Sequence, residues 1–147
     1  MTARVGLIIP ASNRMVEQEM VRHLPPGVVA HVMRLRMTGA HRMPIERLLP
    51  SVEAAAGDLT DARCDVVAFH CTSNSTSEGT AGEAKLLGAL RHAGAPQATT
   101  TASAIRHAFD VLGARRIVLL TPYSEHTTAE EAGFLREAGY DLSLIHI

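Results

Sequence analysis

The sequence has no tryptophan, only two cysteines and no large excess of charge of either sign. Its 14 basic residues nearly balance its 15 acidic residues, so the net charge of −1 offers no electrostatic footprint for nucleic acid or an anionic membrane. No apolar run approaches the ~20 residues of a membrane span, and residues 1–10 lack the long apolar segment of a secretory signal. These absences predict a cytoplasmic protein whose partners are small molecules or other proteins, with a homo-oligomer left open.

Cofactor and metal motifs are absent as well. The sequence contains no HxxH, CxxC or HExxH spacing, which argues against a metal site. It has no GxGxxG after the first predicted strand and no GxxxxGK[ST], so nothing in it indicates a bound nucleotide. Two cysteines, Cys64 and Cys71, do not indicate a disulfide framework in a reducing compartment, and each thiol needs its own explanation.

Short apolar runs alternate along the chain with longer stretches of helical periodicity. The 147 residues, 46% of them hydrophobic, are enough to bury a core without a disulfide or metal. The alternation predicts an α/β protein with a mostly parallel, flavodoxin-like sheet of order 2-1-3-4 and helices on both faces. Strands are expected at 4–10, 28–36, 65–70, 97–101 and 116–121 and from 141; helices are expected after residue 13 and at 45–62, 78–92, 103–112 and 125–138, with a polar turn at 71–77.

An internal resemblance divides the chain. Residues 3–13 (ARVGLIIPASN) resemble residues 115–125 (RRIVLLTPYSE), aligning Pro10 with Pro122 and Ser12 with Ser124. We therefore expect a first α/β half at residues 1–101, containing the Cys71 loop, and at 102–147 a connecting helix and the incomplete beginning of a second, similar half. The counterpart of the Cys71 loop would lie beyond residue 147, and residues 143–147 could be foreign read-through.

Polar residues follow the first and third predicted strands, where a ligand is expected to bind in such a sheet. Asn13 follows the first strand and Cys71, Thr72 and Ser73 follow the third, so the two loops should face each other across one crevice. A cysteine between a strand and a helix lies near backbone N–H groups and a positive helix end, which lower a thiol pKa and favour the nucleophilic thiolate. Thr72, Ser73 and Asn13 could then hold a carboxylate or a developing oxyanion.

Each of these residues also has a plain structural interpretation. Cys71 could be a small buried hydrophobe, and Asn13 could cap the helix that follows it, a role compatible with ligand binding. Tyr123, after the strand of the second copy, could reach the same crevice or be a surface aromatic at a junction. For Cys64, in the turn before the third strand, we expect burial alone.

Other side chains near the crevice are weaker candidates. His70 precedes Cys71, and strand alternation predicts that it points the other way. Arg34, Arg36 and Arg42, around the loop after the second strand, could clamp a second carboxylate or be solvated surface charges.

The segments GLIIPASN, FHCTS and LLTPY, in this order, resemble the maleate cis-trans isomerase and arylmalonate decarboxylase branch of the aspartate/glutamate racemase superfamily, over most of the chain. The resemblance implies two similar α/β halves with a cofactor-free active site between them and typically one cysteine from each half. It implies that Cys71 is the cysteine of the first half, that Asn13 holds a substrate carboxylate and that Tyr123 is the tyrosine of the second half. Thr72 and Ser73 match a carboxylate pocket of the decarboxylases, which carry glycine at the position of Cys71.

The resemblance thus implies a cofactor-independent cis-trans isomerase of a small dicarboxylate, of the maleate-to-fumarate type. The Cys71 thiolate would add to the double bond, rotation would follow, and elimination would give the trans product. The second acid would come from a cysteine beyond residue 147, so we expect little or no turnover from this chain alone. An amino-acid racemase or arylmalonate-type decarboxylase of the same superfamily, and a non-catalytic domain that binds a small acid, remain as alternatives.

Overall fold

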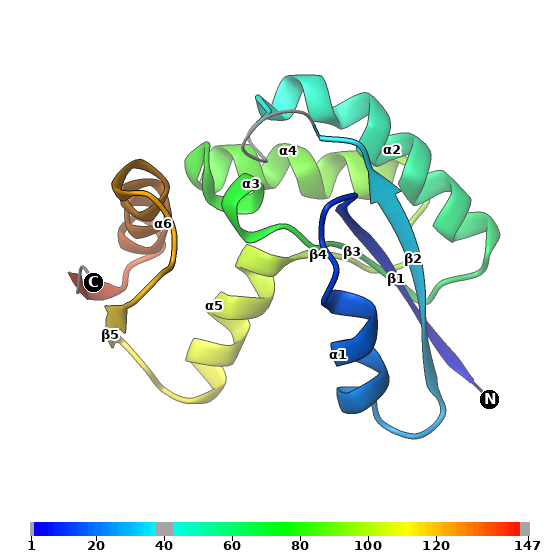
Figure 1. Ribbon diagram of the computed structural model, residues 1–147, viewed down its shortest axis with the longest axis horizontal. Helices are drawn as coiled ribbons and strands as arrows, with labels where there is room; N and C mark the ends of the chain where they lie inside the picture. The colour runs from blue at the N-terminus through cyan, green and yellow to red at the C-terminus, as the bar shows by residue number, and fades with distance from the viewer. Residues whose placement is uncertain (1, 38–42, 145–147) are drawn as a thin grey trace.

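The computed structural model describes residues 2–37 and 43–144. Its main sheet consists of β1 (Ala3–Pro10), β2 (Val28–Leu35), β3 (Val66–Phe69) and β4 (Ala98–Thr100), paired in the order β2-β1-β3-β4 (Figure 1). All three pairings are parallel. The predicted flavodoxin-like order 2-1-3-4 is therefore confirmed.

Helices cover both faces of this sheet, as the alternation predicted. One face packs against α2 (Ile45–Asp61) and α4 (Gly79–His92), and the other against α1 (Val16–His23) (Figure 1). Successive side chains of β1 point to opposite faces of the sheet: Ile8 is buried with α2 and α4, whereas Leu7 and Ile9 are buried with α1. Within the described ranges, no helix is both long and apolar enough to cross a membrane.

The register between β1 and β3 determines which loops become neighbours. Ile8 pairs with Phe69, and the N–H of His70 donates to the Ile8 carbonyl at 2.8 Å. Since parallel strands end at the same edge of a sheet, the segment after Pro10 and the segment after His70 leave the sheet side by side. This edge is where the crevice was predicted.

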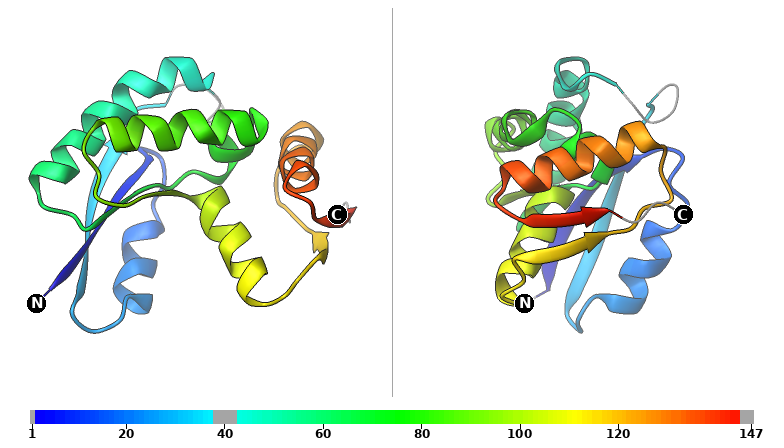
Figure 2. Two further views of the ribbon diagram at one scale, coloured as in Figure 1. Left: turned by 180° about the vertical axis from the view of Figure 1, so that it is seen from behind. Right: turned by 90° about the vertical axis from the view of Figure 1, so that its left-hand side faces the viewer.

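A separate two-stranded sheet follows the main sheet in the chain. From β4, α5 (Thr101–Val111) leads to β5 (Arg116–Leu119), α6 (Glu125–Glu137) and β6 (Asp141–Leu144), and β5 and β6 pair in parallel. Figure 2 shows these two strands side by side with α6 packed over them. This strand–helix–strand connection has the form of β1-α1-β2, matching the sequence resemblance between residues 3–13 and 115–125.

Two of the differences from the expected boundaries involve small polar side chains that bond to nearby backbone. The segment 71–77 is not a simple turn but contains a short helix, α3 (Thr72–Thr76), in which the hydroxyls of Ser75 and Thr76 donate to the Thr72 carbonyl at 3.0 and 3.1 Å. The helix expected from residue 103 begins at Thr101, because the Thr100 hydroxyl accepts the N–H of Ser103 at 2.9 Å and caps it.

A buried carboxylate fastens the connecting helix to the main sheet. Glu83 of α4 is only 2% exposed. It accepts hydrogen bonds from the hydroxyls of Thr100 and Ser103 at 2.6 and 2.5 Å and from Arg106 Nη2 at 2.7 Å. Every donor belongs to β4 or α5, so this one side chain orients α5 and the elements that follow it, β5, α6 and β6.

We expect Glu83→Ala to destabilise the protein by about 3 kcal/mol, because it leaves buried hydroxyls and a guanidinium without their acceptor. Urea unfolding followed by circular dichroism measures the difference. Glu53→Ala is the matched control, because Glu53 is partly exposed and lies 3.5 Å from exposed His92, and its loss should change stability by less than about 1 kcal/mol. Equal effects of the two substitutions would contradict the role given to Glu83.

Candidate functional site

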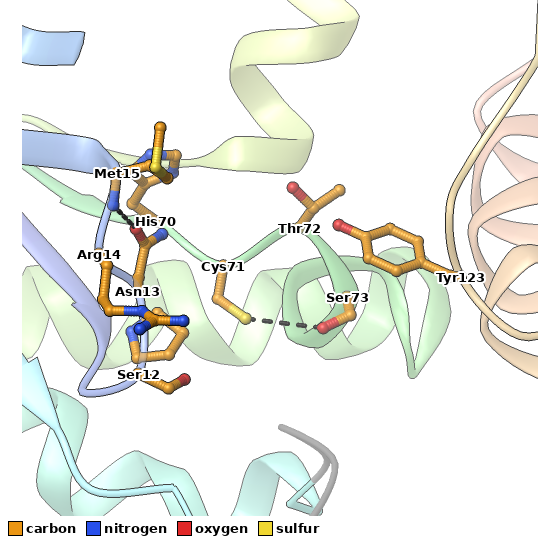
Figure 3. A pocket seen from close by; sticks show the side chains of 10 residues that line it. Ser12, Asn13, Arg14, Met15, His70, Cys71, Thr72, Ser73 and Tyr123 are labelled. Carbon is orange, nitrogen blue, oxygen red and sulfur yellow. Dashed lines mark hydrogen bonds between the residues drawn. The ribbon is translucent and has the colours of Figure 1, made fainter. Parts of the chain in front are cut away.

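A cleft of about 560 Å³ opens at the edge where β1 and β3 end. It brings together all five residues predicted from the sequence, namely Asn13, Cys71, Thr72, Ser73 and Tyr123 (Figure 3). The remaining lining residues are Pro10, Ser12, Arg14, Met15 and His70. Residues from the β1–α1 loop, from the start of α3 and from the β5–α6 loop therefore share one space.

Cys71 lies at the boundary between this cleft and the core. It is 8% exposed, belongs to the cluster formed with α2 and α4, and directly precedes α3. Its thiol donates to the side-chain carbonyl Oδ1 of Asn74 at 3.5 Å and lies 3.7 Å from the Ser73 hydroxyl. A thiol that donates to a carbonyl is held in its protonated form.

The prediction of a lowered Cys71 pKa that favours the thiolate is wrong. Burial raises the pKa of Cys71 above its ordinary value, and the backbone N–H groups of Asn74 and Ser73 lower it by less. The predicted effect of the helix start is therefore present but outweighed, because the sulfur is enclosed and α3 has only five residues. The charge of Glu131 raises the thiol pKa further.

Asn13 both caps α1 and faces the cleft, so the two expected roles coexist in one side chain. Its Oδ1 accepts the N–H groups of Met15 and Val16 at 3.0 and 3.1 Å. With the oxygen fixed by these bonds, the amide nitrogen is turned to the side of Cys71 (Figure 3). Asn13 thus presents a donor to any ligand lying between the two loops.

Arg34 is an exposed side chain that hydrogen-bonds the loop between β1 and α1. It reaches from β2 to the carbonyls of Ala11 and Asn13 at 2.9 and 2.6 Å and pairs with Glu17, which fixes the loop that carries Asn13. Arg36 is exposed, and Arg42 lies outside the described residues.

Tyr123 lines the cleft from the loop between β5 and α6. The residue is 46% exposed, and its hydroxyl is directed toward Thr72 (Figure 3). Partial burial, with smaller effects from Glu131 and Cys71, raises the pKa of the Tyr123 phenol. The phenol therefore stays neutral at physiological pH and can donate a hydrogen bond into the cleft.

Neither His70 nor Cys64 assists the Cys71 thiol. The Nδ1 atom of His70 lies 3.1 Å from the Thr101 hydroxyl, and burial lowers the pKa of the imidazole, so His70 is a neutral group tied to α5. Cys64 is 1% exposed in the turn before β3, which confirms its interpretation as a buried residue. Over residues 2–37 and 43–144, no group of three or more His, Cys, Asp or Glu side chains could hold a metal ion.

Two residues near the cleft were not among those predicted to react with a ligand or bind one. Asn74 is 1% exposed; its Nδ2 donates to the Met43 carbonyl at 3.0 Å while its Oδ1 accepts the thiol of Cys71. Glu131 of α6 is 5% exposed, and burial raises its pKa to about 7. The spacing of Glu131 to Phe134 and Leu135, three and four residues on, was the available signal for its inward position.

Comparison with known proteins extends the resemblance seen in the sequence. The maleate isomerase of Geobacillus stearothermophilus is 26% identical over 95% of this chain and 61% of its own length. The arylmalonate decarboxylase of Bordetella bronchiseptica is 29% identical over 92% of this chain and 56% of its own. The chain therefore spans about 60% of the length of these curated relatives.

The solved structures agree on the fold. A mutant of the Nocardia farcinica maleate cis-trans isomerase with a covalently bound succinylcysteine intermediate matches 100% of this chain and 65% of its own, with a TM-score of 0.81 and 23% identity. A crystal structure of arylmalonate decarboxylase matches 98% of this chain and 61% of its own, with a TM-score of 0.77 and 26% identity. The family model for arylmalonate decarboxylase matches residues 5–147. This chain belongs to the arylmalonate decarboxylase family.

Proposed function

We propose that this chain carries the nucleophile and carboxylate-binding groups of a cofactor-independent cis-trans isomerase acting on a small dicarboxylate such as maleate. The observation that carries the proposal is the placement of the Cys71 thiol and the Asn13 amide on opposite sides of one cleft (Figure 3). A nucleophile beside a donor for a carboxylate is what addition to an unsaturated acid requires.

The relatives support this choice of chemistry. Proteins 26% identical to this chain are maleate isomerases, and in one solved structure of the same fold a cysteine carries a succinyl group. Cys71 is the cysteine that lines the cleft here, whereas Cys64 is enclosed in the core. We therefore assign the covalent step to Cys71.

The proposed reaction begins with one carboxylate held by the Asn13 amide and by the hydroxyls of Thr72 and Ser73. The Cys71 thiol releases its proton to water in the open cleft, and its sulfur then bonds to one alkene carbon. The π electron pair moves toward the carboxylate on the other carbon, leaving a single bond about which the two halves of the substrate rotate. The double bond then re-forms, the carbon–sulfur bond breaks, and the thiolate leaves with the trans acid in the cleft.

Arylmalonate decarboxylation is the second candidate, favoured by a relative that is 29% identical and by the hydroxyls of Thr72 and Ser73 in the cleft. The two candidates are separated by their substrates. A decarboxylase releases carbon dioxide from an arylmalonate, and an isomerase changes only the geometry of maleate.

Incubation with maleate should produce a covalent adduct on Cys71, detected by mass mapping of the cysteine peptides, and NMR should show little or no fumarate. Cys71→Ser should abolish the adduct, whereas Cys64→Ser, which alters only a buried thiol, should retain it. A folded protein that binds maleate equally well with and without Cys71 and never forms an adduct would instead be a domain that only binds small acids.

Replacing Asn13 by Asp tests the carboxylate donor separately from the fold. Asp caps a helix as well as Asn, so stability should change little, but the lost donor and the added negative charge should weaken maleate binding by roughly tenfold to a hundredfold. Calorimetric titration in a Cys71→Ser background, where no adduct forms, measures the affinity.

Gln18→Glu is the matched control for this substitution. It makes the same amide-to-carboxylate change at an exposed position of α1 that does not line the cleft. It should leave the affinity within about twofold of the parent, because an exposed charge is largely screened by solvent and salt. Equal losses of affinity from the two substitutions would mean that net charge alone weakens binding. Asn13 would then not be part of the binding site.

A further inference from the structure

A buried acid on α6 has no part in the mechanism above. Glu131 is 5% exposed, and its Oε1 is buried without a hydrogen-bond partner within the part of the chain that the structure describes. The side chain lines an apolar cavity of about 290 Å³ together with Phe109 and Phe134. An unpartnered carboxylate is strongly disfavoured in such surroundings, so this side chain demands an explanation.

The cavity around Glu131 adjoins the cleft. Thr72 lines both spaces, and α6 packs against α3 at the end of the main sheet (Figure 1). The charge of Glu131 raises the pKa of Cys71 and that of Tyr123, which both line the cleft. Since the cavity that Glu131 lines is mostly apolar, solvent screens the charge of Glu131 weakly on that side.

We propose that Glu131 controls the reactivity of Cys71 from the opposite side of the junction: a neutral Glu131 carboxyl permits the thiol to ionise, and an ionised one opposes it. Glu131 is thus a positioning residue that acts through Cys71 and touches no substrate. The proposal rests on the proposed function only in taking Cys71 as the reacting thiol, and thiol reactivity is measurable without any turnover.

Several charged groups on the elements around α6 have partners of their own. Glu130, beside Glu131, lies 3.5 Å from His126; Arg106 of α5 pairs with Glu83 of α4 and stacks over Phe134; Glu137 accepts the Thr80 N–H of α4; Tyr140 donates to Asp110 of α5; and Asp141 of β6 pairs with Arg116. The residues of α3 carry no charge. No cation therefore neutralises Glu131 among these groups, and burial together with the charge of Glu130 raises its pKa to about 7.

Because Glu131 titrates near pH 7, the reactivity of the Cys71 thiol should have a distinctive pH dependence. Below about pH 7 Glu131 is neutral, and thiolate formation rises about tenfold per pH unit, as for any thiol below its pKa. As the pH rises through 7, Glu131 ionises and its negative charge raises the thiol pKa, so the gain in thiolate per pH unit becomes smaller. Removal of the charge restores the tenfold slope throughout.

The test is the rate at which iodoacetamide, a neutral reagent, alkylates Cys71 between about pH 6 and pH 9, followed by mass mapping of the Cys71 peptide. The thiolate displaces iodide, so the rate reports the ionised fraction. Glu131→Gln should match the parent at about pH 6 and react several-fold faster at about pH 9, without the flattening near pH 7. Glu131→Leu, which suits the apolar lining, should give the same profile if the glutamine variant folds poorly.

Glu137→Gln is the matched control, since it removes the same charge from an exposed position of the same helix and should keep the parent profile. Superimposable profiles of the parent and both Glu131 variants would overturn the proposal. That failure is distinct from failure of the proposed function, in which the predicted profiles would appear but maleate would form no adduct on Cys71.

Discussion

The parallel register of β1 against β3 is the constraint on which the site depends. Ile8 and Phe69 are paired and lie in the same buried cluster, so the register is fixed by what the two strands bury together. A slip of one residue would turn every side chain of one strand to the opposite face, exposing core residues and moving Cys71 away from the Asn13 loop. The geometry of the cleft is therefore a consequence of core packing, and the polar residues that line it need contribute little to the fold.

Burial of Cys71 opposes ionisation of its thiol, and the surrounding groups must offset this effect. The thiol is enclosed by the core and donates to Asn74, which fixes its direction but keeps it protonated. A bound dicarboxylate would add negative charge and oppose ionisation further. Hydrogen-bond donors that stabilise the negative charge of the carboxylate, above all the Asn13 amide, therefore favour the thiolate as well as binding of the ligand. In this interpretation binding and activation of the nucleophile are one electrostatic event.

Features that depend on local sequence pattern could be predicted, whereas features that depend on enclosure in the folded protein could not. Strand order, the cap formed by Asn13 and the meeting of two polar loops could be predicted from periodicity and the rules of parallel sheets. The thiol pKa could not, because it depends on how much protein surrounds the sulfur, and the inward position of Asn74 likewise depends on its contact with the distant Met43 carbonyl. The division into units at residues 1–101 and 102–147 stays a prediction.

The contribution of α6 and its preceding loop to the cleft depends on how α5 leaves the main sheet. Glu83 accepts hydrogen bonds from β4 and the first turns of α5, and β5, α6 and β6 all come after these donors in the chain. Tyr123 lines the cleft, and Glu131 the neighbouring cavity, only while this direction is kept. A distortion at Glu83 would consequently alter the electrostatics of the thiol without touching the cleft, so the ion pair with Arg106 belongs to the machinery of the site as much as to its scaffold.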